Sequence, residues 1–246
     1  MLKIITIITK FILVTLTALL FASCNQSINL NSIKGSGNVT IENRRIDGTF
    51  KSVEVSNAID LVIEQGDNTA ISVEADDNLQ KHITTRVENG VLIVACDYNS
   101  FFNIESKKVI VKTPIIEELS ASSAATINSV NTLRSENISF RTSSAATINV
   151  NVKSDNIHSK SSSGSSITLE GMALNLEALA SSGSSINAGS LLVNDIIAKS
   201  SSGSTIRVHP IVNLNATATS GSNISYKNQP QTIRKMVHSG GSVDKQ

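Results

Sequence analysis

The sequence has no tryptophan, and aromatic residues make up only 3% of its 246 residues, although 40% are hydrophobic. Any hydrophobic core must therefore be built from aliphatic side chains, in one large domain or two small ones. Cysteine is scarce too, at two residues, so a disulfide framework does not explain the fold. Neither sign of charge dominates, because the net charge is +1, or about −1 without Lys3 and Lys10 of a leader. Such a chain has no general attraction to nucleic acid or anionic membranes.

The chain begins MLKIITIITKFILVTLTALLFASC, which has the pattern of a secretory leader. Two lysines precede an apolar run that ends at Ala22 and is too short for a membrane-spanning helix. The ending Phe-Ala-Ser-Cys resembles the lipobox of bacterial lipoproteins, with phenylalanine in place of the more usual leucine. That resemblance implies cleavage before Cys24 and acylation of its thiol; the alternative is an ordinary cleaved leader with an incidental cysteine. We expect residues 1–23 to be a lipoprotein-type signal peptide and the polar residues 24–34 to be a tether.

The other cysteine, Cys96, lies in the apolar stretch VLIVACDY. Once Cys24 is acylated, Cys96 has no partner within the chain. We therefore expect a small buried hydrophobic residue rather than a reactive thiol.

A short phrase of small residues followed by an apolar residue recurs along the second half of the chain. Four residues before each of these apolar anchors stands a serine, and three before it stands glycine or alanine. The intervals between successive anchors are 21, 19, 19, 20, 18 and 19 residues. Such a period indicates a repeat architecture. The anchors are Ile127, Ile148, Ile167, Ile186, Ile206, Ile224 and Val243.

Within one repeat the apolar residues follow steps of two and three, which indicate strand alternation interrupted by corners. From Ile186 they continue at Ala188, Leu191, Val193 and Ile196. Repeats of about 19 residues with three short strands predict one coil each of a parallel β-helix, whose backbone hydrogen bonds go to the coils above and below. The alternative, a disordered serine-rich spacer, would not show an aligned apolar column.

The serine phrases are expected to form the corners of the coils. Alanine shares the column with glycine at Ala124 and Ala145, so we attribute the small residues to close stacking of corners rather than to a positive φ. The neighbouring serines can hydrogen-bond along the stack or to the turn backbone.

Residues 35–118 differ from the repeats at 119–246 and predict a β-rich N-terminal part that caps the solenoid or merges into it. Asn89-Gly90 stands between two alternating apolar stretches, which is a hairpin signal. The stretch after Ala75 suits one helical turn capped by Asp76 or Asp77. SNAID, which contains Ile59, echoes the later corner phrase, and a boundary near Thr113-Pro114 is plausible.

The stretch FKSVEVSNAIDLVIEQGDNTAISVEADDNLQKHITTRVENGVLIV, followed by the serial serine corners, resembles the bacterial envelope family called "putative auto-transporter adhesin, head GIN domain". The resemblance covers roughly residues 35 to 245. It implies an all-β fold with a right-handed parallel β-helix, an outer-envelope location and a role in adhesion. It supplies no catalytic motif.

Residues that could carry chemistry are scattered relative to the repeat. The four histidines, His82, His158, His209 and His238, share no column, and the acidic residues of the repeats share no offset from the anchors. No glycine-rich calcium repeat, phosphate-binding loop or nucleophile elbow is present. We therefore expect no catalytic residues, no cofactor and no metal site.

Two surfaces remain as candidates for binding. The residues that follow the anchors form a polar column that should face outward; it includes Asn128, Asn149, Asn187 and Arg207, with Thr168, Ser225 and Asp244. The segment DYNSFFN concentrates the aromatic residues Tyr98, Phe101 and Phe102. The column also suits an ordinary solvated face, and the aromatics also suit a plug at the end of the core.

The combined prediction is a lipid-anchored, non-enzymatic protein of the cell envelope, located as an outer-membrane lipoprotein, that presents a β-helix for adhesion or interaction. Its expected partners are the membrane, through a lipid on Cys24, and a glycan or an envelope protein, with no nucleic acid. The alternatives are a polysaccharide lyase or hydrolase and an envelope scaffold or assembly protein. The sequence leaves open the ligand, the oligomeric state and whether the periplasmic or the surface-exposed face carries the protein.

Overall fold

The computed structural model describes residues 9–11, 14–15, 32–98 and 100–246. Ser32–Gln246 forms one compact unit and Met1–Asn31 another. Cys24 and nearly all of the expected leader lie outside the described residues. Every buried core residue of the described part of the chain lies in Ser32–Gln246, so we treat this unit as folding autonomously. Within the described part of the chain, no helix has the length and apolar character needed to cross a membrane.

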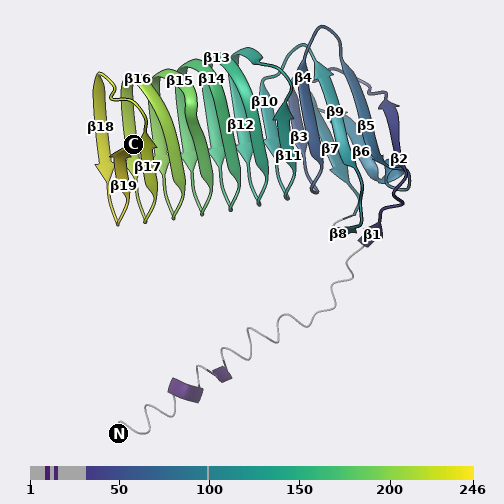
Figure 1. Ribbon diagram of the computed structural model, residues 1–246, viewed down its shortest axis with the longest axis horizontal. Helices are drawn as coiled ribbons and strands as arrows, with labels where there is room; N and C mark the ends of the chain where they lie inside the picture. The colour runs from purple at the N-terminus through teal and green to yellow at the C-terminus, as the bar shows by residue number, and fades with distance from the viewer. Residues whose placement is uncertain (1–8, 12–13, 16–31, 99) are drawn as a thin grey trace. The chain divides into compact units, whose positions relative to one another are not determined.

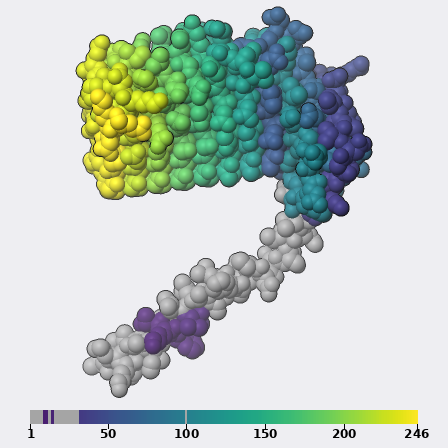
Figure 2. Space-filling view, in the orientation of Figure 1, coloured from purple at the N-terminus to yellow at the C-terminus, as the bar shows by residue number. Residues whose placement is uncertain are grey.

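The repeats form a parallel β-solenoid of about seven turns, as predicted (Figure 1). Each coil pairs with the next in parallel and nearly in register, so that the anchors Ile148, Ile167 and Ile186 lie above one another. Figure 2 shows the coils as successive bands across the surface. The strands of this region are β10 (Glu118–Ala121), β11 (Thr126–Ser129), β12 (Leu133–Thr142), β13 (Thr147–Ser161), β14 (Ser166–Ala180), β15 (Ser185–Ser200), β16 (Thr205–Ala218), β17 (Asn223–Tyr226), β18 (Thr232–Val237) and β19 (Ser242–Lys245).

Three faces can be recognised in each coil from the alternation of buried and exposed residues. In β14 the alternation is interrupted around Gly171 and again at Leu174-Asn175, where two successive side chains are exposed. We call residues 166–170 and their partners in other coils the first face, residues 172–174 the second face and residues 175–180 the third face. Most inward side chains are aliphatic, and Phe140 and Tyr226 are the buried aromatic residues among the described repeats.

The small residues of the corners have a different cause from the one predicted. Both central residues of each corner have a positive φ, for example Ser182 at 53° and Gly183 at 69°, and Ala124 and Ala145 do as well, at 61° and 62°. A Cβ atom added to Gly183 would meet nothing within 4 Å. The crowding explanation is therefore wrong: the small residues serve a left-handed turn, which Ser181 O closes by accepting from Ser184 N at 3.2 Å.

The serines of the corners hydrogen-bond along the stack, as expected. Ser184 is buried, and its Oγ donates to Ser161 O of the preceding coil at 2.8 Å and accepts from Ser181 N at 3.1 Å. Ser204 and Ser222 repeat the inter-coil bond, to Ala180 O and Ser200 O. These three corners are thus tied to the coil before them by a side chain as well as by the backbone, whereas Ala125 and Ala146 at the same position of the first two corners cannot make this bond.

The N-terminal part continues the solenoid with an unusual order of strands. β3 (Ser52–Val55) and β4 (Asp60–Gln65) form a coil that pairs on one side with β10 and β11. On its other side it pairs with β7 (Val91–Cys96) and β9 (Lys107–Thr113), which come later in the sequence. The coil of β3 and β4 is therefore intercalated between two layers that follow it in the chain, as the neighbouring labels in Figure 1 show.

Antiparallel strands cover this end of the solenoid, which confirms the predicted β-rich cap. The hairpin at Asn89-Gly90 is confirmed, with φ values of 52° and 78° at its two residues. SNAID forms a corner with positive φ at Asn57 and Ala58, but its anchor is Leu61, which pairs with Ile127, rather than Ile59. The remaining strands are β1 (Ser32–Lys34), β2 (Val39–Arg44), β5 (Ala70–Asp76), β6 (Ile83–Glu88) and β8 (Ser100–Phe102).

The expected capped helical turn is only partly correct. A 3-10 turn, η2 (Gln80–His82), is present, but no side chain caps it. Asp76 is instead fully buried and accepts backbone N–H bonds from Gly37 at 2.7 Å, Glu105 at 2.9 Å and Ser106 at 3.1 Å. Burial alone would raise the pKa of Asp76, but these donors outweigh it and the pKa is lowered. Asp76 thus joins three segments of the cap.

Two further polar or reactive groups are buried in the cap. Cys96 is a buried free cysteine, as predicted, and burial raises the pKa of its thiol. Lys107 Nζ donates to Asn57 O in the first corner at 2.7 Å and lies 3.3 Å from the ring centre of Phe101. Burial lowers the pKa of Lys107 to about 8. Lys107 therefore stabilises the SNAID corner through this hydrogen bond, although burial of its amine is itself unfavourable.

Candidate functional site

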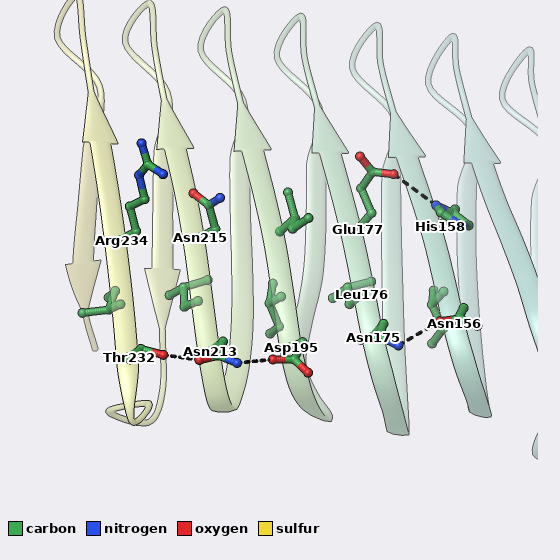
Figure 3. Close-up of a pocket in the computed structure, with 15 residues that line it drawn as sticks. Asn156, His158, Asn175, Leu176, Glu177, Asp195, Asn213, Asn215, Thr232 and Arg234 are labelled. Carbon is green, nitrogen blue, oxygen red and sulfur yellow. Dashed lines mark hydrogen bonds and ion pairs between the residues drawn. The ribbon is translucent and has the colours of Figure 1, made fainter.

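A groove of about 620 Å³ runs across the third face of the solenoid (Figure 3). Because successive coils pair in register, the outward side chains that line it form columns parallel to the stacking axis. The first column contains Asn156, Asn175, Asp195, Asn213 and Thr232. The second column contains His158, Glu177, Ile197, Asn215 and Arg234.

The first column is an amide ladder in which each coil donates to the coil before it. Asn156 Nδ2 donates to Asn137 Oδ1 at 2.8 Å, and Asn175 Nδ2 donates to Asn156 Oδ1 at 2.8 Å. Further along, Asn213 Nδ2 donates to Asp195 Oδ1, and Thr232 Oγ1 donates to Asn213 Oδ1. Such ladders are a known stabilising device of stacked strands.

The ladder is interrupted at Asp195. A carboxylate has no N–H, so Asp195 cannot continue the sequence of donors toward Asn175. Among the described residues, no group donates to Asn175 Oδ1, and the only donor to Asp195 is Asn213 Nδ2. Figure 3 shows the gap as the place where the dashed bonds stop. Two neighbouring coils therefore present oxygen acceptors side by side, with no protein donor between them.

The second column places varied side chains beside this gap. His158 Nδ1 lies 3.1 Å from Glu177 Oε2, which pairs the first two members of the column. Ile197 is 44% exposed on an otherwise polar row. Asn215 Oδ1 is buried and has no hydrogen-bond partner among the described residues. The groove thus combines unpaired acceptors with one apolar contact surface.

This arrangement suits a ligand that is rich in hydroxyl groups. Hydroxyls can donate to Asn175 Oδ1, which has no donor among the described residues, and to the carboxylate of Asp195, whose one such donor is Asn213. The C–H surface of a sugar ring can at the same time cover Ile197. The repeat along the stack would let a linear ligand make the same type of contact in successive coils.

The polar column predicted from the sequence lies elsewhere, on the first face. Asn128, Asn149, Thr168, Asn187 and Arg207 are aligned in successive coils, and all but the half-buried Thr168 are exposed. Asn149 Nδ2 donates to Asn128 Oδ1 at 3.0 Å. Ser225 is buried, and Asp244 is exposed in the last strand. This column does not contribute to the groove.

The predicted aromatic residues belong to the cap. Tyr98 and Phe101 are partly buried against the core, and Tyr98 also makes an edge-to-face contact with His82 at 4.6 Å between ring centres. Phe102 is 49% exposed in β8, which pairs with β1. Two of the three aromatics thus cover apolar surface, as the plug interpretation requires, and only Phe102 is about half exposed.

Sequence reasoning missed the groove, although its signal was present. Asn137, Asn156 and Asn175 are spaced by 19 residues, and so are His158 and Glu177. The predicted polar column contains only the residue after each anchor, whereas the groove lies about eight to ten residues after it, on the third face. The histidines otherwise lie apart: His82 is in the cap, His209 pairs with Leu192 on the second face and His238 is near the last corner. Among the described residues, no group of His, Cys, Asp or Glu could hold a metal ion.

Comparison with known proteins gives both a family and a fold. The sequence matches, over residues 49–230, the family described as "Putative auto-transporter adhesin, head GIN domain". Among curated proteins, none matches the sequence.

Solved structures resemble nearly the whole described unit. A "putative adhesin" from Bacteroides fragilis has a TM-score of 0.78 and 18% identity, and the match covers 87% of this chain and 98% of that one. A "putative lipid binding protein" from Parabacteroides distasonis has a TM-score of 0.73 and 19% identity, with 88% and 100% covered. A "putative adhesin" from Parabacteroides merdae has a TM-score of 0.70 and 20% identity, with 87% and 99% covered. At these identities the likeness establishes the fold alone.

Proposed function

This chain belongs to the "Putative auto-transporter adhesin, head GIN domain" family, and we propose that it is a lipid-anchored, non-enzymatic protein of the cell envelope. In this proposal the solenoid is a rigid head, and the groove on the third face binds a glycan. Adhesion-like binding is the activity that the family description suggests.

The observation that carries the glycan proposal is the interrupted ladder at Asp195. An asparagine at this position would complete the ladder with its neighbours Asn175 and Asn213. A residue that breaks a favourable local pattern in one coil is the kind of exception expected at a functional position. The carboxylate leaves acceptors free for hydroxyl donors of a ligand, and hydrogen bonds to a charged acceptor are stronger than those to a neutral one.

The lipid anchor is supported by the sequence around Cys24. The two lysines, the short apolar run and the lipobox-like ending together suit a lipoprotein leader. We expect Cys24→Ala to abolish labelling by a radioactive fatty acid and to move the protein from the membrane fraction to the soluble fraction. Continued membrane attachment of that variant would contradict the anchor. For the unsubstituted protein, protease treatment of intact cells shows which face of the outer membrane carries it.

The glycan proposal is tested with purified Ser32–Gln246 on a broad glycan array. The matched variants are Asp195→Asn, which completes the ladder, and Asn187→Ala, which removes an exposed polar side chain on the first face. For any glycan that the unsubstituted protein binds, we expect Asp195→Asn to weaken affinity about tenfold or more, and Asn187→Ala to leave it unchanged.

The thermal stability of Asp195→Asn separates binding from folding. We expect it to equal or exceed that of the unsubstituted protein, because the new amide can donate to Asn175 Oδ1. Glycan binding that survives Asp195→Asn but is lost in Asn187→Ala would move the site to the first face. Absence of binding to every glycan would overturn the glycan proposal and direct attention to protein partners, as expected of an envelope scaffold.

A second candidate is a carbohydrate-active enzyme, because the carboxylates of Glu177 and Asp195 line the same groove. Glycoside hydrolases use a pair of carboxylates, one as acid and one as base or nucleophile. Incubation of each bound polysaccharide with the protein, followed by an assay for new reducing ends, distinguishes the two. Release that disappears in both Glu177→Gln and Asp195→Asn would replace the adhesin proposal by this one.

A further inference from the structure

A second groove, of about 820 Å³, lies on the second face and has a different character. Four large apolar side chains are exposed in it: Met172 by 49%, Leu174 by 50%, Leu192 by 42% and Ile211 by 39%. Soluble proteins seldom expose such a cluster unless it binds something. None of these residues lines the groove of the third face.

The second face has two outward columns, because each coil contributes two outward side chains that flank one inward residue. Residues i and i+2 of a strand lie on the same face, about 7 Å apart. Column A consists of Arg134, Lys153, Met172, Leu192 and His209, which the strand register aligns. Column B consists of the residues two positions later, Glu136, Asp155, Leu174, Asn194 and Ile211.

The charges of the two columns are opposite at one end of this surface. The first two coils carry Arg134 and Lys153 in column A and Glu136 and Asp155 in column B. The following coil is apolar in both columns, with Met172 and Leu174, and the last two coils each carry one large apolar residue among polar ones. The surface therefore changes along the stack from charged pairs to apolar pairs.

Such a pattern is complementary to itself under one symmetry operation. A two-fold axis parallel to the solenoid axis places each coil opposite the same coil of a second copy and exchanges the columns. Arg134 then faces the second copy's Glu136, Lys153 faces its Asp155, and Met172 faces its Leu174. Every charge meets an opposite charge, and the central apolar residues meet apolar residues.

An antiparallel arrangement does not have this property. With the axis across the stack at the coil of Met172, Lys153 would face Leu192 of the second copy and lose water without gaining a partner. With the axis between the two charged coils, Arg134 would face Lys153, and like charges repel. Unpaired or like charges in an interface cost affinity, so these arrangements are disfavoured.

We propose that the second face is a homodimer interface in which two copies lie side by side with their coils parallel and in register. The five coils span about 20 Å at about 4.8 Å each, so the interface is small and its affinity in solution is weak. The parallel arrangement keeps both Ser32 ends on the same side. It also leaves both grooves of the third face open, so a dimer would offer two of them to a multivalent ligand.

The test is sedimentation equilibrium of Ser32–Gln246 between about 1 µM and about 1 mM, at low and at high salt. We expect a concentration-dependent dimer that salt weakens. Lys153→Asp places a carboxylate opposite the partner's Asp155 and is expected to raise the dissociation constant about tenfold or more. Adding Asp155→Lys to that variant reverses both charges, restores the pairing, and is expected to recover most of the affinity.

Recovery of the dimer in the double variant is the decisive result. A change in overall surface charge alone would not restore affinity when the two charges are exchanged. Met172→Asp is expected to abolish the dimer, whereas Ile197→Asp, at a similarly exposed apolar residue of the third face, is expected to leave it intact. Circular dichroism of each variant checks folding. A monomer at every concentration, or a dimer that both charge variants leave unaffected, would overturn the proposal and leave the surface to a partner of another kind.

Discussion

Gly171 and Gly183 are both glycines with positive φ, but they need glycine for different reasons. Gly183 has a φ of 69° in an open corner, and the column it occupies accepts alanine in the first two repeats. Gly171 has a φ of 114°, and a Cβ atom there would lie 2.2 Å from Val152 O. Glycine is favoured at position 183 because it adopts a positive φ without strain. At position 171 it is needed because any side chain would collide with the backbone of a neighbouring coil.

We therefore expect Gly183→Ala to lower the free energy of unfolding by about 1 kcal/mol. Gly171→Ala should lower it by about 3 kcal/mol or more, because the backbone of one coil must move away from the next. Chemical denaturation of Ser32–Gln246 measures both. Equal effects of the two substitutions would contradict the distinction between them.

The burial of Lys107 predicts how the stability of the protein depends on pH. Its pKa is about 8 in the folded protein, against 10.5 for an ordinary lysine, because it is buried. Between these two values the unfolded chain holds a proton that the folded protein has released, so stability rises with pH through this range. This increase in the free energy of unfolding is fully present above the pKa of Lys107 in the unfolded chain. It is lost as the pH falls through the pKa of Lys107 in the folded protein.

The measurement compares the unsubstituted protein with Lys107→Met from about pH 7.5 to about pH 10.5. The difference in their free energies of unfolding should change by roughly 2–3 kcal/mol in favour of the unsubstituted protein as the pH rises. Titration of groups that do not interact with Lys107 is common to both proteins and cancels, and replacing Cys96 by alanine in both proteins removes its coupling to Lys107. A difference that stays constant would show that Lys107 remains charged in the fold.

At the scale of the element, the corner turn can be improved. Both central positions of each turn have a positive φ, as in a type I′ turn, and Asn-Gly is the preferred pair there. Ser182→Asn should raise the free energy of unfolding by about 0.5 kcal/mol, since asparagine tolerates the left-handed region better than serine. Ser181→Asn is the control, because Ser181 lies outside the positive-φ pair. A gain in the control alone would argue against this reading of the turn.

How much of each element follows from the sequence depends on whether its determinants are local. The anchors and the Asn89-Gly90 hairpin were predictable because period and turn chemistry lie within a few residues. The role of Asp76 was not, because its donors Gly37 and Ser106 are distant in sequence and nothing local marks them. The same holds for β3 and β4: their alternation predicts strands, but it cannot say that later strands occupy both of their edges.

The candidate site was predictable in one respect and missed in another. The register that builds the groove is a direct consequence of the 19-residue period, which the sequence displays. The break in the ladder becomes visible only when Asn175, Asp195 and Asn213 are seen as neighbours, because an aspartate in a polar strand is unremarkable by itself. Polar columns occur on every face, so the pattern alone did not say which one contains a groove.

At the scale of the whole molecule, the solenoid is expected to tolerate loss of a coil. Deleting residues 166–184 joins Ser165 to Ser185, and the register of the neighbouring coils is kept. Stability in such repeats is a sum of coil and interface terms, so a folded, shorter and less stable protein should result. Circular dichroism and thermal melting measure this. A chain that fails to fold would show that the coils are not interchangeable.

The intercalated coil of β3 and β4 has a consequence for the order of events during biogenesis. These strands are synthesised before all four of the strands that pair with them, β7, β9, β10 and β11. A nascent chain therefore has no native partner for this coil until β7 has been made, and it lacks the full set of four until Ser129 at the end of β11. A secreted polypeptide must cross a narrow channel while still unfolded. If the chain is exported as we propose, this strand order delays pairing of the first coil, so the leading part of the chain stays unfolded and competent for translocation until β7 follows it.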